Sequence, residues 1–138
     1  MGRLDAGERV LLDDGGLELE VLEEGRGRVL CRVIIGGLLS SHKGINVPTT
    51  NLHFSAVTDK DREDVQFALA HDVDFFAASF VRSAADIQEL RRLIRDAGAH
   101  VAIVAKIEKR EALVRFDEIL DAANGVMVAR GDLGVETP

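Results

Sequence analysis

Polar side chains follow three apolar stretches of the sequence, each at the point where the stretch ends. They are Ser79 and Arg82 after the stretch that starts near Asp74, Lys106 and Glu108 after the one that starts near His100, and Arg130 and Asp132 after the one that starts near Gly125. Parallel α/β folds build their sites where the carboxyl ends of strands meet, and adjacent strands lie roughly 5 Å apart. We therefore predict that these groups converge on one ligand.

Two local features favour a ligand site, although a charge just past a strand usually marks only the place where the chain leaves the core. Lys106 and Glu108 face the same side of an extended chain because they are two residues apart. An ion pair with only a structural role would be enough to explain Lys106 and Glu108. Asp132 is flanked by Gly131 and Gly134, and glycine lets backbone N–H groups come close to an anion. The segment therefore predicts a contribution to anion binding.

After Ser55 the sequence alternates between helical patterns and apolar strands. Thr58, with Asp61 three residues later, resembles a capping box. Ser83 is predicted to cap a second helix, which Gly98 stops. The apolar helix faces are Val65, Ala68 and Leu69; Ile87, Leu90, Ile94 and Ala97; and Leu113, Phe116, Leu120 and Ala123, while the buried strands are residues 73–81, 101–105 and 126–129. Strand, helix, strand, helix and strand predict two right-handed units with parallel strands.

The first fifty or so residues have a different pattern, typical of a small antiparallel meander. Apolar residues in 17–21 and 29–33 alternate with polar ones, as in half-buried strands. Turn signals at 13–16 and 25–27 separate these strands from each other and from a short strand at 10–12. Residues 36–52 have the composition of a connecting segment.

Composition excludes several classes of protein. A chain of 138 residues with 46% hydrophobic residues can bury the core of one domain, and no apolar run is long enough to predict a membrane span or signal peptide. The 24 acidic residues outnumber the 17 basic ones, which argues against a nucleic-acid partner. Cys31 is the single cysteine, which excludes an internal disulfide and predicts a reducing, cytoplasmic location.

Five motifs closely resemble those of the pyruvate kinase family. They are Asp13-Asp14-Gly15, Lys43-Gly44-Ile45-Asn46-Val47-Pro48, Ser79-Phe80-Val81-Arg82, Lys106-Ile107-Glu108 and the run from Met127 to Glu136. The motifs occur in the family's order and at its spacing, so the resemblance spans essentially the whole chain. The Lys-Ile-Glu motif alone would be a weak signal, but the run from Met127 makes it a strong one.

The resemblance implies an α/β fold, with three parallel strand–helix units of a (β/α)8 TIM barrel preceded by part of a small antiparallel β domain. Residues 1–53 would be the C-terminal half of that inserted domain, and residues 54–138 would supply barrel strands four to six. The family's other barrel strands and its C-terminal regulatory domain have no counterpart in the chain. Residues 109–112 replace the family's usual Asn-x-Glu-Gly with Lys-Arg-Glu-Ala, and Thr137 replaces an isoleucine.

The resemblance also implies a reaction, the glycolytic transfer of a phosphoryl group from phosphoenolpyruvate to ADP that gives pyruvate and ATP. It assigns catalysis to Lys106 and metal binding to Glu108 and Asp132. Substrate binding is assigned to Lys106, Gly131, Asp132 and Ser79, and nucleotide binding to Lys43 and Asp14. We expect Arg130 to brace its loop. The metal would be Mg²⁺ or Mn²⁺. The family's K⁺ ligands and phosphate-binding arginine would lie outside this chain.

The resemblance implies a homotetrameric full-length enzyme without nucleic-acid or membrane partners, whereas the isolated chain is expected to be inactive and to self-associate through its unpaired sheet edges. Two alternatives remain open at this point. A related barrel lyase, a metal-dependent aldolase, would also place a glutamate and an aspartate on a metal, but it would not explain Lys106 or the meander. The chain could also be a non-catalytic metal- or anion-binding domain, or an engineered or truncated piece.

Overall fold

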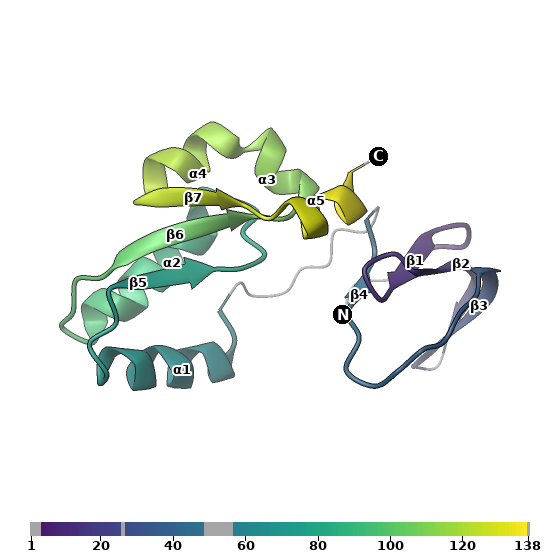
Figure 1. The fold of residues 1–138 in the computed structure, drawn as a ribbon, viewed down its shortest axis with the longest axis horizontal. Coiled ribbons are helices and arrows are strands. Elements are labelled where there is room, and N and C mark those ends of the chain that lie inside the picture. Colours follow the sequence, from purple (N-terminus) through teal and green to yellow (C-terminus); the bar gives the residue numbers. More distant parts are fainter. Residues whose placement is uncertain (1–3, 26, 49–56, 138) are drawn as a thin grey trace. The chain divides into compact units, whose positions relative to one another are not determined.

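The computed structural model describes residues 4–25, 27–48 and 57–137 and is drawn in Figure 1. The chain divides into two compact units, residues 1–54 with 134–138 and residues 55–133. Four predicted features lie outside the described residues. They are the domain boundary between residues 53 and 54, the start of the helical pattern after Ser55, Arg26 of the second predicted turn, and the end of the predicted connection. Among the helices that the structure describes, none is long and apolar enough to cross a membrane.

The first unit contains an antiparallel sheet with the strand order β3-β2-β1-β4. Its strands are β1 (Arg9–Leu12), β2 (Leu17–Gly25), β3 (Arg28–Ile35) and β4 (Ile45–Asn46). The predicted meander is confirmed as β1 to β3. The prediction that residues 36–52 hold no element was wrong, because Ile45 and Asn46 pair with Leu12 and Leu11 of β1. A strand of two residues is too short to show the alternation that identifies strands in a sequence.

The turn between β1 and β2 agrees with its sequence signal. The Gly16 N–H donates to the Asp13 carbonyl oxygen at 2.9 Å. The two central residues, Asp14 and Gly15, have φ values of 53° and 85°, and a type I′ hairpin turn requires positive φ at both positions. Asp-Gly is favoured there because aspartate tolerates this region and glycine has no Cβ to obstruct it. The turn therefore places Asp14 at the tip of the hairpin.

The second unit contains a parallel sheet with the strand order β5-β6-β7. Its strands are β5 (Phe75–Ala78), β6 (Ala102–Ile107) and β7 (Gly125–Val128), and its helices are α1 (Asp59–Leu69), α2 (Ala84–Asp96), α3 (Arg110–Val114) and α4 (Phe116–Ala122). A last helix, α5 (Arg130–Glu136), begins directly after β7 and continues past residue 133. The predicted alternation of parallel strands and helices is confirmed (Figure 1).

The core of the second unit lies between the parallel sheet and its helices. Alternate residues of β6, Ile103, Ala105 and Ile107, are buried, whereas the residues between them are only partly buried. Helix α2 packs against β6, α1 and α4 (Figure 1). Its buried residues are Ile87, Leu90 and Ile94, and the same core includes Val57, Val65, Val81, Ala112 and Ile119. The helices thus cover one face of β6, which leaves the side chain of Lys106 on the opposite side.

The ends of the first two helices follow the predicted signals. The Asp61 N–H donates to the Thr58 hydroxyl at 3.1 Å, and the Asp61 carboxylate accepts from the Thr58 N–H at 2.8 Å, which completes the capping box. At the start of α2, the Asp86 carboxylate accepts from the Ser83 N–H at 3.2 Å. Gly98, with φ of 77°, follows the end of α2 in the left-handed region that glycine adopts readily.

The predicted third helix differs from the structure because it is broken. Arg115, with φ of −113° and ψ of 27°, separates α3 from α4. Leu113 and Leu120 of the predicted apolar face are 45% and 46% exposed, whereas Ala112 and Ile119 are fully buried. The predicted face assumed one uninterrupted helical period. The break at Arg115 interrupts that period, so different residues reach the core.

The predicted buried stretch 73–81 is also less regular than its sequence suggests. The strand is limited to Phe75–Ala78, and Phe75 and Phe80 are 65% and 59% exposed. Strand β5 is an edge strand of this sheet within the described residues, so it is covered less than the central strand β6. Ala97, expected on the apolar face of the second helix, is instead its exposed last cap residue.

Candidate active site

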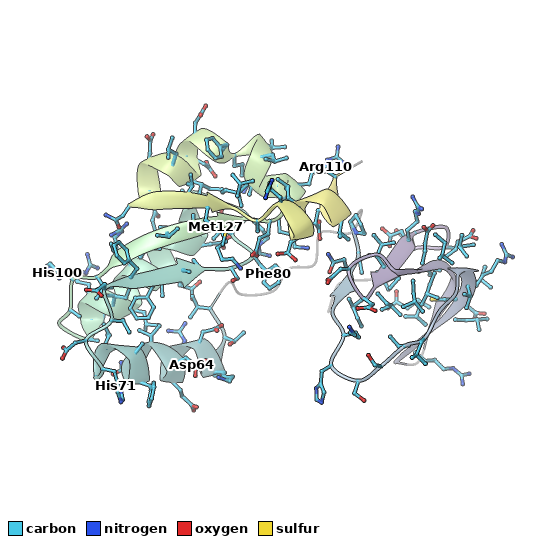
Figure 2. All side chains as sticks on the ribbon, in the orientation of Figure 1. Asp64, His71, Phe80, His100, Arg110 and Met127 are labelled. Atoms are coloured by element: carbon cyan, nitrogen blue, oxygen red, sulfur yellow. The ribbon has the colours of Figure 1, made fainter. Side chains whose placement is uncertain are left out.

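The site is organised by the register of the parallel sheet. Ala78, the last residue of β5, pairs with Ala105, so Ser79 follows at the level of Lys106. On the other side of β6, Lys106 pairs with Met127, and the Ala129 N–H donates to the Ile107 carbonyl oxygen at 3.1 Å. The carboxyl ends of all three strands therefore meet at one edge, as predicted. Figure 2 shows Phe80 beyond the end of β5 and His100 at the opposite end of the sheet.

Lys106 is the centre of a small polar cluster. Its Nζ donates to the Ser79 Oγ at 3.2 Å and forms an ion pair with the Glu108 Oε1. The Lys106 side chain is 23% exposed and the Glu108 side chain is 2% exposed. The structure thus brings together three of the predicted site residues. The ion pair places Lys106 and Glu108 on the same side of the chain, which confirms the expectation from their spacing.

Glu108 has both carboxylate oxygens occupied. Its Oε1 pairs with Lys106, and its Oε2 accepts a hydrogen bond from the Phe80 N–H at 2.8 Å. A buried carboxylate is costly unless it is paired and hydrogen-bonded, so these two contacts account for a glutamate in the core. The sequence did not indicate the contribution of Phe80. Its φ of 55° lies in the left-handed region, where bulky residues are uncommon and for which a phenylalanine gives no signal.

Gly131 and Asp132 lie in the first turn of α5, and both are exposed. A Cβ added to Gly131 or to Gly134 would meet no atom within 4 Å, so the space beside both glycines is open. The hydrogen bonds and ion pairs of the described residues do not connect Asp132 with Lys106 or Glu108. The described residues also contain no group of three or more His, Cys, Asp or Glu side chains that could hold a metal ion. The metal-binding roles of Glu108 and Asp132 therefore stay predictions.

The arginines near the strand ends occupy different places. The Arg82 guanidinium lies 3.5 Å from the Asp86 carboxylate, and its backbone N–H donates to the same carboxylate at 2.7 Å. These contacts connect the loop after β5 to the start of α2. Arg130 is the first residue of α5 and is exposed, and its bracing role stays a prediction. The Nζ of Lys109 lies over the Phe80 ring, 5.9 Å from its centroid, a cation–π distance.

The two predicted nucleotide-binding residues lie near each other in the first unit. The Lys43 Nζ is 2.7 Å from the Asp13 Oδ1, and the Asp13 N–H donates to the Gly44 carbonyl oxygen at 3.4 Å. The hydrogen bond with Asp13, with a smaller effect of the Asp14 carboxylate, raises the pKa of Lys43 above its ordinary value of 10.5. The ammonium group is therefore held beside the hairpin turn that carries Asp14.

A cavity of about 340 Å³ lies at the amino-terminal end of the parallel sheet, and Arg91 is one of its lining residues. The Arg91 guanidinium donates to the Ala122 carbonyl oxygen at 2.7 Å and to the Asn124 Oδ1 at 3.1 Å. The same Asn124 oxygen accepts from the Ile103 N–H at 3.0 Å. These bonds tie α2 to the first residues of β6 and to the turn before β7. The cavity is therefore separate from the polar cluster at the carboxyl ends.

The fold and the cluster define a class of protein before any comparison: an α/β protein with a charged site at the carboxyl edge of a parallel sheet. The particular family follows from comparison with known proteins. The family model of the pyruvate kinase barrel domain matches residues 1–138, so the chain belongs to the pyruvate kinase family. The resemblance inferred from the five motifs is confirmed, and the family assignment decides against the barrel-lyase alternative.

Curated relatives support the same assignment. The chain is 53% identical over 135 residues to pyruvate kinase 2 of Synechocystis, covering 96% of this chain and 23% of the relative. It is 46% identical over 138 residues to the pyruvate kinase of Geobacillus stearothermophilus, covering 98% and 24%. It is 44% identical over 132 residues to the pyruvate kinase of Thermotoga maritima, covering 96% and 28%. The chain thus spans about a quarter of the length of these relatives.

Proposed function

We propose that this chain is the central part of a pyruvate kinase, which transfers a phosphoryl group from phosphoenolpyruvate to ADP and gives pyruvate and ATP. The observation that carries the proposal is the contact of Lys106 with both Glu108 and Ser79 at the carboxyl edge of the sheet. These three residues come from two of the motifs that resemble the family. Identities of 44% to 53% over nearly the whole chain support the same activity for the protein that contains it.

The parallel sheet would be strands four to six of a (β/α)8 barrel, and the antiparallel sheet would be part of the inserted β domain. Helices on one face of β6 and polar groups at its carboxyl end support this arrangement, since barrel enzymes place their helices outside and their sites at that end. In this arrangement residues 1–53 belong to the inserted domain and residues 54–138 to the barrel. The partly exposed side of β6 would then face the barrel interior.

Lys106 would stabilise the charge of the phosphoryl group during transfer. The transition state of phosphoryl transfer spreads negative charge over its oxygens, so positioned positive charge contributes much of the catalysis. Contacts with Glu108 and Ser79 hold the ammonium group in place, and the Lys106 side chain is 23% exposed, which leaves it open to a substrate. A lysine suits this role because its charge is concentrated on one small group.

The donor set fits a divalent cation with hard oxygen ligands. Glu108 and Asp132 would hold Mg²⁺ or Mn²⁺, and Mg²⁺ typically takes one or two protein carboxylates and completes its shell with water and substrate oxygens. When bound, the ion would neutralise charge on the transferring phosphoryl group. Because Glu108 already contacts Lys106, a cation at this carboxylate would share or replace that contact. The family's K⁺ would require ligands outside this chain.

The remaining roles follow the exposed polar groups. The backbone amides of Gly131 and Asp132 would meet the carboxylate of the substrate, and the open space beside Gly131 supports such an approach. Lys43 would bind the phosphates of the nucleotide. Asp14 would meet the nucleotide's metal from the tip of the hairpin, where it is exposed.

The experiment that tests the proposal replaces Lys106 in the whole enzyme that contains this sequence. Lys106→Met is expected to lower kcat by about a hundredfold or more, the usual loss when one electrostatic contact to a transition state is removed. Turnover is measured in a coupled assay with lactate dehydrogenase, and thermal unfolding is recorded in parallel. Lys60→Met, on the exposed surface of α1, serves as the control and should keep wild-type turnover. Wild-type turnover in Lys106→Met would remove this lysine from the mechanism.

A further inference from the structure

Phe80 has a backbone conformation that its side chain does not explain. Its φ of 55° is in the left-handed region, which disfavours residues with a Cβ because that atom approaches the following carbonyl oxygen. The ring is 59% exposed, so its burial does not offset this cost. A strained residue of this kind persists only when its surroundings determine its conformation, and such residues cluster at functional sites.

The residues on either side of Phe80 indicate what the conformation achieves. In a continuous extended strand, Ser79 and Val81 would face the same side of the sheet. Instead, the Ser79 hydroxyl contacts Lys106 at the site, while Val81 is 1% exposed and belongs to the core beneath the helices. The left-handed residue thus lets the side chains on either side of it lie in opposite environments. In the same step its N–H is directed at the Glu108 Oε2, at 2.8 Å.

We propose that Phe80 is a positioning residue whose backbone, rather than its ring, orients Glu108 for a divalent cation. This inference rests on the proposed function, in which Glu108 is a metal ligand. Lys106 holds Oε1 and the Phe80 N–H holds Oε2, so the buried carboxylate is fixed in one orientation before the cation arrives. Without the left-handed turn the N–H points elsewhere and the carboxylate loses one of its two anchors.

Substitutions at Phe80 can separate its backbone from its ring in the whole enzyme. Phe80→Gly and Phe80→Asn remove the ring but tolerate positive φ, whereas Phe80→Val removes the ring and disfavours that region strongly. The probe is Mn²⁺ alone, with its dissociation constant obtained from the relaxation of water protons. Phe80→Val is expected to weaken Mn²⁺ binding by up to about tenfold, because β-branching adds to the left-handed penalty that phenylalanine already carries, and to raise the Mn²⁺ concentration that half-activates the enzyme. Phe80→Gly and Phe80→Asn are expected to bind Mn²⁺ within about twofold of wild type, since both residues adopt positive φ readily and can keep the N–H directed at Glu108.

The outcomes distinguish this inference from the proposed function. Glu108→Gln is the reference for a lost ligand, and unchanged Mn²⁺ binding in that variant would contradict the proposed metal site itself. If Glu108→Gln weakens binding but Phe80→Val does not, the positioning role is refuted. Equal weakening in the three Phe80 variants would assign the effect to the ring and would also refute the role. If circular dichroism shows that Phe80→Val is unfolded, the comparison is made between Phe80→Ala and Phe80→Gly, and equal affinities there would refute the proposal.

Discussion

Replacing Glu108 by glutamine tests whether the buried carboxylate is held as the structure indicates. Glutamine has nearly the same shape, so the substitution leaves no cavity. It has one carbonyl oxygen to accept hydrogen bonds, whereas the carboxylate serves two donors, the Lys106 ammonium and the Phe80 N–H. In any orientation of the amide, one of these donors faces an NH₂ group and loses its acceptor.

The size of the effect follows from the burial of the two donors. Hydrogen bonds to charged groups contribute about 1.5 to 3 kcal/mol, and a buried donor left without an acceptor costs about 1 to 3 kcal/mol. The Lys106 side chain is 23% exposed and keeps its contact with the Ser79 hydroxyl, so water offsets part of its loss. We therefore expect Glu108→Gln to lower the free energy of unfolding by about 2 kcal/mol, the middle of the range for a buried donor left without an acceptor.

The measurement is urea unfolding of the 138-residue chain, with every variant at the same protein concentration because self-association would shift the midpoint. Unfolding is followed by far-ultraviolet circular dichroism because the sequence has no tryptophan or tyrosine. Helices α1 to α4 all belong to the unit of residues 55–133, so the helical signal reports on the unit that contains Glu108. With a typical urea dependence, the midpoint should fall by about 1 M. Glu111→Gln on α3 is the matched control and should change stability by less than about 0.5 kcal/mol. A shift for Glu108→Gln as small as that of the control would refute the reasoning.

Two further predictions concern the start of α1 and the tip of the hairpin. Thr58→Ala should lower stability by about 1 kcal/mol in the same unfolding measurement. The Thr58 hydroxyl and N–H hold the pKa of Asp61 below its ordinary value of 3.8. This carboxylate therefore stabilises the fold above that pH, and its contribution is lost as the pH falls through the lowered pKa. The difference between the unfolding midpoints of Thr58→Ala and wild type should narrow in acid, but the part that comes from the bond between the Asp61 N–H and the Thr58 hydroxyl should remain. Asp14→Ala in the whole enzyme should reduce ADP-dependent turnover but spare the proton exchange of pyruvate, and equal loss in both assays would indicate a folding defect instead.

The sequence determined those features that depend on neighbouring residues. The capping box joins Thr58 to Asp61 three residues away, and the hairpin turn needs only Asp14 and Gly15 to accept positive φ. Lys106 and Glu108 share a side because an extended chain repeats every two residues. Such features were predicted correctly because the interactions that form them lie within one turn or one strand.

Only the tertiary structure decided how the candidate site is assembled. Ser79 reaches Lys106 across 27 residues and the Phe80 N–H reaches Glu108 across 28, and both contacts depend on the register of β5 against β6. The break at Arg115 and the pairing of β4 with β1 were likewise missed. These features arise when separate elements pack together, because the core selects the register and the conformations that bury its apolar side chains. The left-handed conformation of Phe80 has the same origin. No local preference of phenylalanine favours this conformation, but it allows Val81 to be buried and the buried Glu108 carboxylate to be hydrogen-bonded.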